Sequence, residues 1–119
     1  MVRALRGATT VEANDANQII VETGVMLRRI VEENKLDAED IISVIFTVTE
    51  DLNAAFPAVA ARQLGWTSTA LMCTKEIDVP GSLKKCIRVL MHINTEKGKD
   101  ELKHIFLKEA RALRPDLSQ

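Results

Sequence analysis

Apolar and polar residues alternate along this chain with two different periods, which separates the expected strands from the expected helices. Small, β-branched and apolar residues fill four stretches, a composition typical of buried β-strands. These stretches are residues Val2–Val11, Ile41–Thr49, Thr69–Ile77 and Cys86–Asn94. A turn at Val79-Pro80-Gly81-Ser82 separates the last two, so they are expected to follow one another directly.

Two further stretches carry apolar residues at three- and four-residue spacing, the pattern of a helix with one buried face. Asn14 or Asp15 can cap the first helix, which we expect to end near Asn34. The second begins at Pro57, a residue suited to a first helical turn, and ends near Gly65.

A third helix is expected near the end of the sequence. It would open at Asp100 and end at Arg114-Pro115, because proline disfavours helical geometry in the residue before it. Its apolar face would hold Leu102, Ile105, Phe106, Ala110 and Leu113. The order β–α–β–α–β–β–α predicts an α+β fold in which helices pack against a mixed sheet. With 119 residues, we expect a single domain over residues 1–119.

Composition excludes two classes of partner. There are 16 Lys and Arg against 17 Asp and Glu, a net charge of −1, so no broad basic face for nucleic acid is expected. Four aromatic residues and no tyrosine leave no base-stacking platform. The longest apolar stretch, Ile41–Val48, is too short to span a bilayer. Charges near the amino terminus interrupt any signal-peptide pattern, so we expect a cytoplasmic protein without a membrane partner.

Metal and cofactor chemistry also lacks a sequence signal. Cys73 and Cys86 both fall in strand-like runs and are expected to be reduced core thiols, with a disulfide as the alternative. No Cys-x-x-Cys, His-x-His or His-Glu-x-x-His spacing indicates a metal site. The scattered glycines form no phosphate-binding motif. We therefore expect neither a metal nor a cofactor.

Charged residues inside two of the expected strands are the clearest candidates for function. Arg6 and Arg88 lie within apolar runs, and a guanidinium that cannot lose its proton needs an anionic partner when it is buried. Glu76, at the end of a strand, could accept a hydrogen bond from a ligand hydroxyl or act as a base. A structural ion pair between Arg88 and Glu76, or exposure of Arg88 at a strand edge, is the alternative. The residues alone indicate a small protein with arginines poised for an anionic ligand.

Four longer strings extend this reading by resemblance. They are residues Arg3–Glu12, Asp51–Ala58, Glu76–Val89 and the closing Leu113-Arg114-Pro115-Asp116-Leu117. Together they resemble the monofunctional AroH-type chorismate mutases, in order and over nearly the whole chain.

This resemblance implies a homotrimer with a pseudo-barrel core and active sites in clefts between subunits. The implied reaction is the Claisen rearrangement of chorismate to prephenate, on the route to phenylalanine and tyrosine, without cofactor, metal or covalent intermediate. It assigns Arg88 to the breaking ether oxygen and a carboxylate, Arg6 to a carboxylate, and Glu76 to the ring hydroxyl.

The resemblance also assigns a lining to the cleft. The lining residues would be Phe56, Ala58, Val59, Arg62, Leu71, Met72, Cys73, Thr74 and Lys75, with Leu113 and Arg114 near the mouth. Two positions depart from the family. Phe106 stands where a tyrosine usually reaches a substrate carboxylate, and Val59 stands where a lysine can occur.

The sequence alone leaves two other functions open. A reactive-imine deaminase also uses trimeric clefts with an arginine for a carboxylate, although its motifs are not visible in this sequence. A catalytically weak or silent trimer that binds an anionic metabolite of the aromatic pathway is the other, since Phe106 removes one hydrogen-bond donor.

Overall fold

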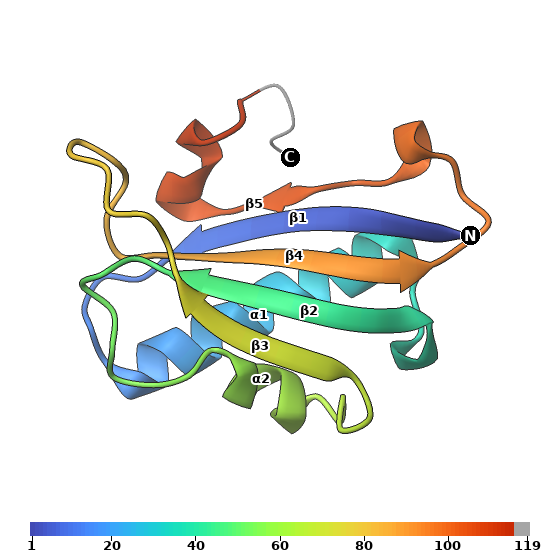
Figure 1. The fold of residues 1–119 in the computed structure, drawn as a ribbon, viewed down its shortest axis with the longest axis horizontal. Helices are drawn as coiled ribbons and strands as arrows, with labels where there is room; N and C mark the ends of the chain where they lie inside the picture. The colour runs from blue at the N-terminus through green and yellow to red at the C-terminus, as the bar shows by residue number, and fades with distance from the viewer. Residues whose placement is uncertain (116–119) are drawn as a thin grey trace.

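The computed structural model describes residues 1–115, and its central feature is one five-stranded sheet (Figure 1). The strands are β1 (Val2–Thr10), β2 (Ile41–Val48), β3 (Ala70–Lys75), β4 (Cys86–Asn94) and β5 (Ile105–Phe106). The helices are α1 (Ala16–Asn34) and α2 (Ala58–Gln63), with short 3₁₀ turns η1 (Ala38–Asp40), η2 (Lys99–Glu101) and η3 (Lys108–Ala112). Asp116 and Leu117 of the closing motif lie outside the described residues.

The sheet is mixed, with the order β3-β2-β4-β1-β5. Its central strand β4 runs antiparallel to both β1 and β2. The outer pairs, β2 with β3 and β1 with β5, are parallel. The predicted class, helices packed on a mixed sheet, is therefore confirmed.

The two α-helices begin and end where their sequences predict. The Asp15 side chain accepts a 2.9 Å hydrogen bond from the backbone N–H of Gln18 and so caps α1. Lys35 ends that helix in the left-handed region, with a φ of 52°. Helix α2 follows Pro57 and is closed by Gly65, whose φ of 90° suits glycine. Within residues 1–115, no helix is both long and apolar enough to cross a membrane.

The predicted third helix is wrong. Residues 99–112 form two 3₁₀ turns that flank the short strand β5. The segment pairs with the outer edge of β1, where the N–H of Leu107 donates to the carbonyl of Ala8 (2.9 Å). Edge strands carry unpaired backbone groups, and satisfying them competes with helix formation. Lys108 then adopts a φ of 54°, which interrupts any helix at that point.

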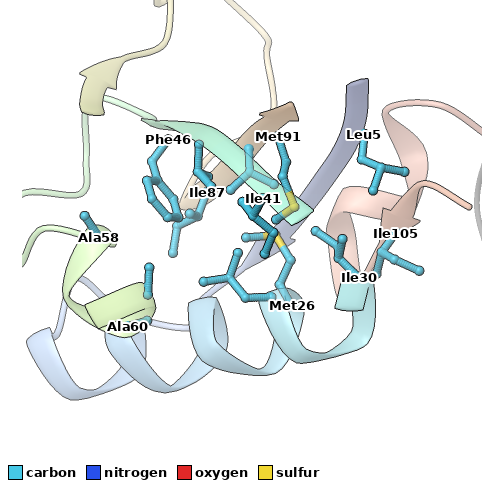
Figure 2. Packing of buried hydrophobic residues seen from close by; sticks show 14 of the residues in the cluster. Leu5, Met26, Ile30, Ile41, Phe46, Ala58, Ala60, Ile87, Met91 and Ile105 are labelled. Carbon is cyan, nitrogen blue, oxygen red and sulfur yellow. The ribbon is translucent and has the colours of Figure 1, made fainter. Parts of the chain in front are cut away.

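The main core fills the space between the helices and one face of the sheet. Figure 1 shows α1 and α2 on the same side of the strands, and Figure 2 shows side chains of Met26 and Ile30 on α1 meeting those of the sheet. Gly7 of β1 allows this approach, because a Cβ there would lie 2.8 Å from Cδ1 of Ile30 and 3.0 Å from Cγ2 of Val89. We call this side of the sheet the covered face.

No α-helix among residues 1–115 covers the opposite side, which we call the open face. Only one corner is closed, by a small cluster in which η3 and the end of β5 pack over β1 and β4. Its buried members are Ala8, Cys86, Phe106 and Ala110. Thr10 is also buried at this corner, and the other open-face side chains of the strands are exposed or half-buried, including both candidate arginines.

Candidate active site

Two arginines from adjacent strands lie on the open face. Arg88 of β4 is paired with Ala8 of β1, and Arg6 of β1 is paired with Leu90, two residues further along β4. This register makes the two arginines diagonal neighbours, and such positions are about 7–8 Å apart in antiparallel strands. Two fixed positive charges therefore share one region of the sheet.

Among residues 1–115, Glu76 supplies the only carboxylate that lines this region. It directly follows β3, and its backbone N–H donates to the carbonyl of Val48 on β2 (2.9 Å). The hydroxyl of Thr47, also on β2, donates to Oε2 of Glu76 over 2.6 Å. The sequence does not distinguish Thr47, which is one ordinary β-branched residue in a strand. Only the pairing of β2 with β3 and β4 places it between Glu76 and Arg88.

The ion pair that the sequence offered as an alternative does form. Nε of Arg88 lies 3.5 Å from Oε2 of Glu76, with side chains 20% and 29% exposed. The contact is not a hydrogen bond, and Nε of Arg88 is buried without a hydrogen-bond partner within residues 1–115. A buried donor without an acceptor is costly, and a ligand oxygen would relieve that cost. With two guanidinium groups and one carboxylate, the region keeps a net positive charge.

Two neighbouring groups respond to this environment. Burial raises the pKa of the Cys86 thiol, and the nearby Arg88 partly offsets that rise. Burial lowers the pKa of His104, and the charges of Arg6 and Arg114 lower it further. The prediction of free thiols is confirmed for both cysteines, although Cys73 is half-buried rather than a core residue.

The two arginines, Glu76 and Thr47 line a cavity of about 340 Å³ that opens to solvent, which we call the cationic cavity. Its lining residues are Arg6, Ile45, Thr47, Glu76, Arg88, Val89 and Leu90. A second hollow of about 400 Å³ lies beyond Glu76 and is lined by Glu50, Asp51 and Asp78 among others. A hydrogen bond and charge repulsion from Asp78 raise the pKa of Glu50. That hollow is acidic, so the cationic cavity is the better site for an anion.

A separate groove of about 670 Å³ runs along the edge of the sheet between β3 and the segment that leads into α2. We call it the edge groove. Phe56, Cys73, Thr74 and Lys75 are the predicted cleft residues among its lining. Phe56 is 69% exposed, so its ring offers a large unpartnered apolar surface. The edge groove and the cationic cavity share no lining residue.

The remaining predicted residues on α2 and β3 do not line the edge groove. Ala58 is buried, Val59 is half-buried, and Arg62 is exposed on the last turn of α2. Leu71 packs partly against the main core. Met72 is exposed on the open face, paired with Ile45 of β2.

The predicted residues near the carboxyl end lie beside the cationic cavity. Phe106 is fully buried against Ala8 and Cys86 and does not line the cavity. Leu113 packs partly against the same cluster, and Arg114 is exposed. Because the charge of Arg114 acts on His104, which accepts a hydrogen bond from the backbone of Arg6, Arg114 belongs to this side of the molecule.

The side chains of Arg6, Arg88 and Glu76 together form an anion-binding site. Two permanent cations and one oriented carboxylate on an open sheet face suit a ligand that carries carboxylates and a hydroxyl. Within residues 1–115, no group of three or more His, Cys, Asp and Glu is placed to hold a metal ion. The site is built to bind and orient an anion through fixed charges.

Comparison with known proteins identifies the family. The family described as chorismate mutase type I matches residues 2–117, so the chain belongs to the type I chorismate mutases. The chain is 44% identical to chorismate mutase AroH of Bacillus subtilis (strain 168), over 99% of this chain and 94% of that protein. It is 48% identical to chorismate mutase AroH of Thermus thermophilus, over 98% of this chain and 97% of that protein.

A solved structure agrees with these relatives. The chorismate mutase from Clostridium thermocellum Cth-682 superposes with a TM-score of 0.92 at 61% sequence identity. The match covers 92% of this chain and 98% of that one. The family resemblance noted in the sequence is therefore confirmed.

Proposed function

We propose that this chain is a chorismate mutase whose reaction takes place at the cationic cavity. One observation carries the proposal: Arg6, Arg88 and Glu76, drawn from three separate parts of the sequence, line a single cavity. Their charges match a ligand with two carboxylates and a ring hydroxyl. The product, prephenate, is an isomer of chorismate and an intermediate on the route to phenylalanine and tyrosine.

The reaction explains why positioned charge is sufficient. One C–O bond breaks and one C–C bond forms within the same molecule, so no proton, electron pair or group passes to the protein. Holding the flexible side chain over the ring supplies part of the acceleration, because a positioned conformer has already lost its freedom. A fixed positive charge beside the ether oxygen supplies another part, because that oxygen becomes more negative as the bond breaks.

The three polar residues divide these tasks. We assign Arg88 to the ether oxygen and a carboxylate, and its buried Nε, which has no hydrogen-bond partner within residues 1–115, supports this role. Arg6 binds a substrate carboxylate, and Glu76 accepts a hydrogen bond from the ring hydroxyl. Arginine suits the first role because its guanidinium stays charged and presents a planar fork of donors.

The proposed assembly is a homotrimer in which each cleft joins two subunits. The cationic cavity and the edge groove are separate hollows of one chain, although the family assignment gives both to the substrate. A cleft that pairs the cationic cavity of one subunit with the edge groove of its neighbour brings Arg6, Glu76 and Arg88 together with Phe56, Cys73, Thr74 and Lys75. The open face also exposes apolar side chains such as Met72, which an interface would cover. Sheets facing one another in this way would form the pseudo-barrel core.

The activity is tested by adding purified protein to chorismate and following the loss of its absorbance, with prephenate confirmed as the product. A catalytically silent binder would bind chorismate in calorimetry without converting it. A deaminase would release ammonia from an imine substrate and leave chorismate unchanged.

The shared cleft is tested by mixing two inactive variants. Arg88→Ala damages the cationic cavity, and Phe56→Asp damages the edge groove. If each cleft takes one half from each subunit, mixed trimers contain some intact sites and regain part of the activity. Light scattering should give about three times the chain mass. A fully active monomer would contradict the shared cleft.

A further inference from the structure

Thr47 ties Glu76 to the middle of the sheet. Its hydroxyl donates to Oε2 of Glu76 over 2.6 Å, and the next residue of β2, Val48, accepts the backbone N–H of Glu76. Two consecutive residues of one strand therefore fix both the backbone and the side chain of Glu76. A hydrogen bond to a carboxylate at this distance belongs to the strong, charge-assisted kind.

The two oxygens of Glu76 have different surroundings. Oε2 receives the Thr47 hydroxyl and faces Nε of Arg88 at 3.5 Å. Oε1 forms no hydrogen bond or ion pair with any residue in the described part of the chain, 1–115. An ionised carboxylate has about four acceptor positions, so Oε1 is the oxygen with capacity for a ligand hydroxyl.

The separation between Arg88 and Glu76 is also informative. An arginine and a carboxylate that meet freely tend to form two parallel hydrogen bonds. These two remain at 3.5 Å without one, although Nε of Arg88 is buried and lacks an acceptor. The Thr47 hydroxyl donates to Oε2 and so holds the carboxylate in place, which opposes closure of the pair.

We propose that Thr47 is a positioning residue that presents Oε1 of Glu76 to the substrate hydroxyl and keeps Glu76 from closing onto Arg88. This inference rests on the proposed function. Without the Thr47 hydroxyl, the carboxylate turns toward Arg88, and both groups are then withdrawn from the ligand. Thr47 thus keeps both the Glu76 carboxylate and the Arg88 guanidinium available to the ligand, without touching the reacting atoms.

The test compares Thr47→Val, which keeps the branched shape and removes the donor, with Thr47→Ser, which keeps the donor. Thr47→Val should lower kcat/KM about 10- to 100-fold, the range expected for losing a hydrogen bond to a charged group. Thr47→Ser should stay within about threefold of the wild type. Ser43→Ala removes a hydroxyl from the same strand and face, one that contacts His92, and should stay within about twofold.

A double-mutant cycle separates positioning from general stability. In a Glu76→Ala background, Thr47→Val should change kcat/KM by less than about twofold, because Thr47 acts through Glu76. A full 10-fold loss in that background would overturn the proposal. Circular dichroism and Tm monitor folding, and Thr47→Ala provides a second donor-free variant if Thr47→Val does not fold.

The outcomes distinguish this inference from the activity itself. A wild type that fails to convert chorismate overturns the proposed function, and the role of Thr47 falls with it. An active wild type with an equally active Thr47→Val variant overturns only the role of Thr47.

Discussion

The two faces of the sheet use the same strands for opposite purposes. On β4, Ile87, Val89 and Met91 point into the covered face and are essentially fully buried. Between them, Arg88 and Leu90 point to the open face, and both remain partly accessible. Because side chains alternate along a strand, a permanent charge is held rigidly beside the core without entering it. Substitutions on the covered face should therefore affect folding, and substitutions on the open face should affect binding and catalysis.

The largest effect on the covered face should come from Phe46 of β2, which is fully buried. Phe46→Ala should lower the free energy of unfolding by about 3–5 kcal/mol, through lost burial and the cavity left behind. Urea unfolding followed by circular dichroism measures this loss. Val21→Ala, at an exposed position of α1, is the control and should change stability by no more than about 0.5 kcal/mol. A loss at Phe46 no larger than the control would contradict the division of the two faces.

On the open face, Arg6→Ala should weaken binding while preserving the fold. Losing a hydrogen-bonded carboxylate contact is expected to cost about 1.5–3 kcal/mol, seen as a KM increase of roughly 10- to 100-fold. Steady-state kinetics should show kcat changing much less than KM, because this contact is present in both the ground state and the transition state. A fall in kcat with KM unchanged would instead assign Arg6 to the transition state.

The smallest effect on stability should come from His104, a half-buried residue that contacts the backbone of the binding residue Arg6. Its Nδ1 accepts the backbone N–H of Arg6 (2.9 Å), a bond that the protonated ring cannot form. Burial, then the charges of Arg6 and Arg114, lower the pKa of His104 below its usual 6.5. His104 lines a small surface hollow, and the other titratable or charged residues in its lining are Arg3, His92 and Lys99.

The sign of this pH dependence follows from linkage. Below about pH 6.5 the unfolded chain takes up a proton at this residue before the folded chain does, so folding stability falls as the pH is lowered. His104→Asn keeps an acceptor and removes the titration. Urea unfolding between pH 7.5 and pH 5 should therefore show a smaller decline for His104→Asn than for the wild type. Identical declines would exclude His104 as the source.

Most of the sheet could be predicted from the sequence because its strands carry local signals. The β-branched run of β2 and the alternation along β4 are visible without any tertiary contact. The segment after Gly98 misled the prediction because Leu102, Ile105, Phe106 and Ala110 satisfy a helical period by coincidence. In the fold, Ile105 packs into the main core and Phe106 into the small cluster on the opposite face. The free edge of β1 decides this outcome, and no local pattern reports it.

The candidate site also combines residues that the sequence indicates with residues that only the fold reveals. Arg6 and Arg88 are visible in the sequence because a charge inside an apolar strand is unusual. Thr47 is not visible, because threonine is common in strands and Glu76, its partner, lies 29 residues away. The separation of the cationic cavity from the edge groove also depends on topology, since the sequence predicts one set of cleft residues without showing that they form two hollows.

Arg88 is the residue that we propose stabilises the transition state with its charge. The direct measurement is kcat and KM for chorismate in the wild type, Arg88→Ala and Arg88→Lys, with Tm recorded for each. Arg28→Ala, at an exposed site on α1, is the matched control and should be silent.

Arg88→Ala should lose about 10²–10³ in kcat, or roughly 2.7–4 kcal/mol, while it stays folded. Arg88→Lys should recover only part of the loss, because an ammonium keeps the charge without the planar fork. A rise in KM with kcat preserved would make Arg88 only an anchor for a carboxylate. Loss of the fold in both variants would make its contact with Glu76 a structural ion pair, and either result would contradict the account.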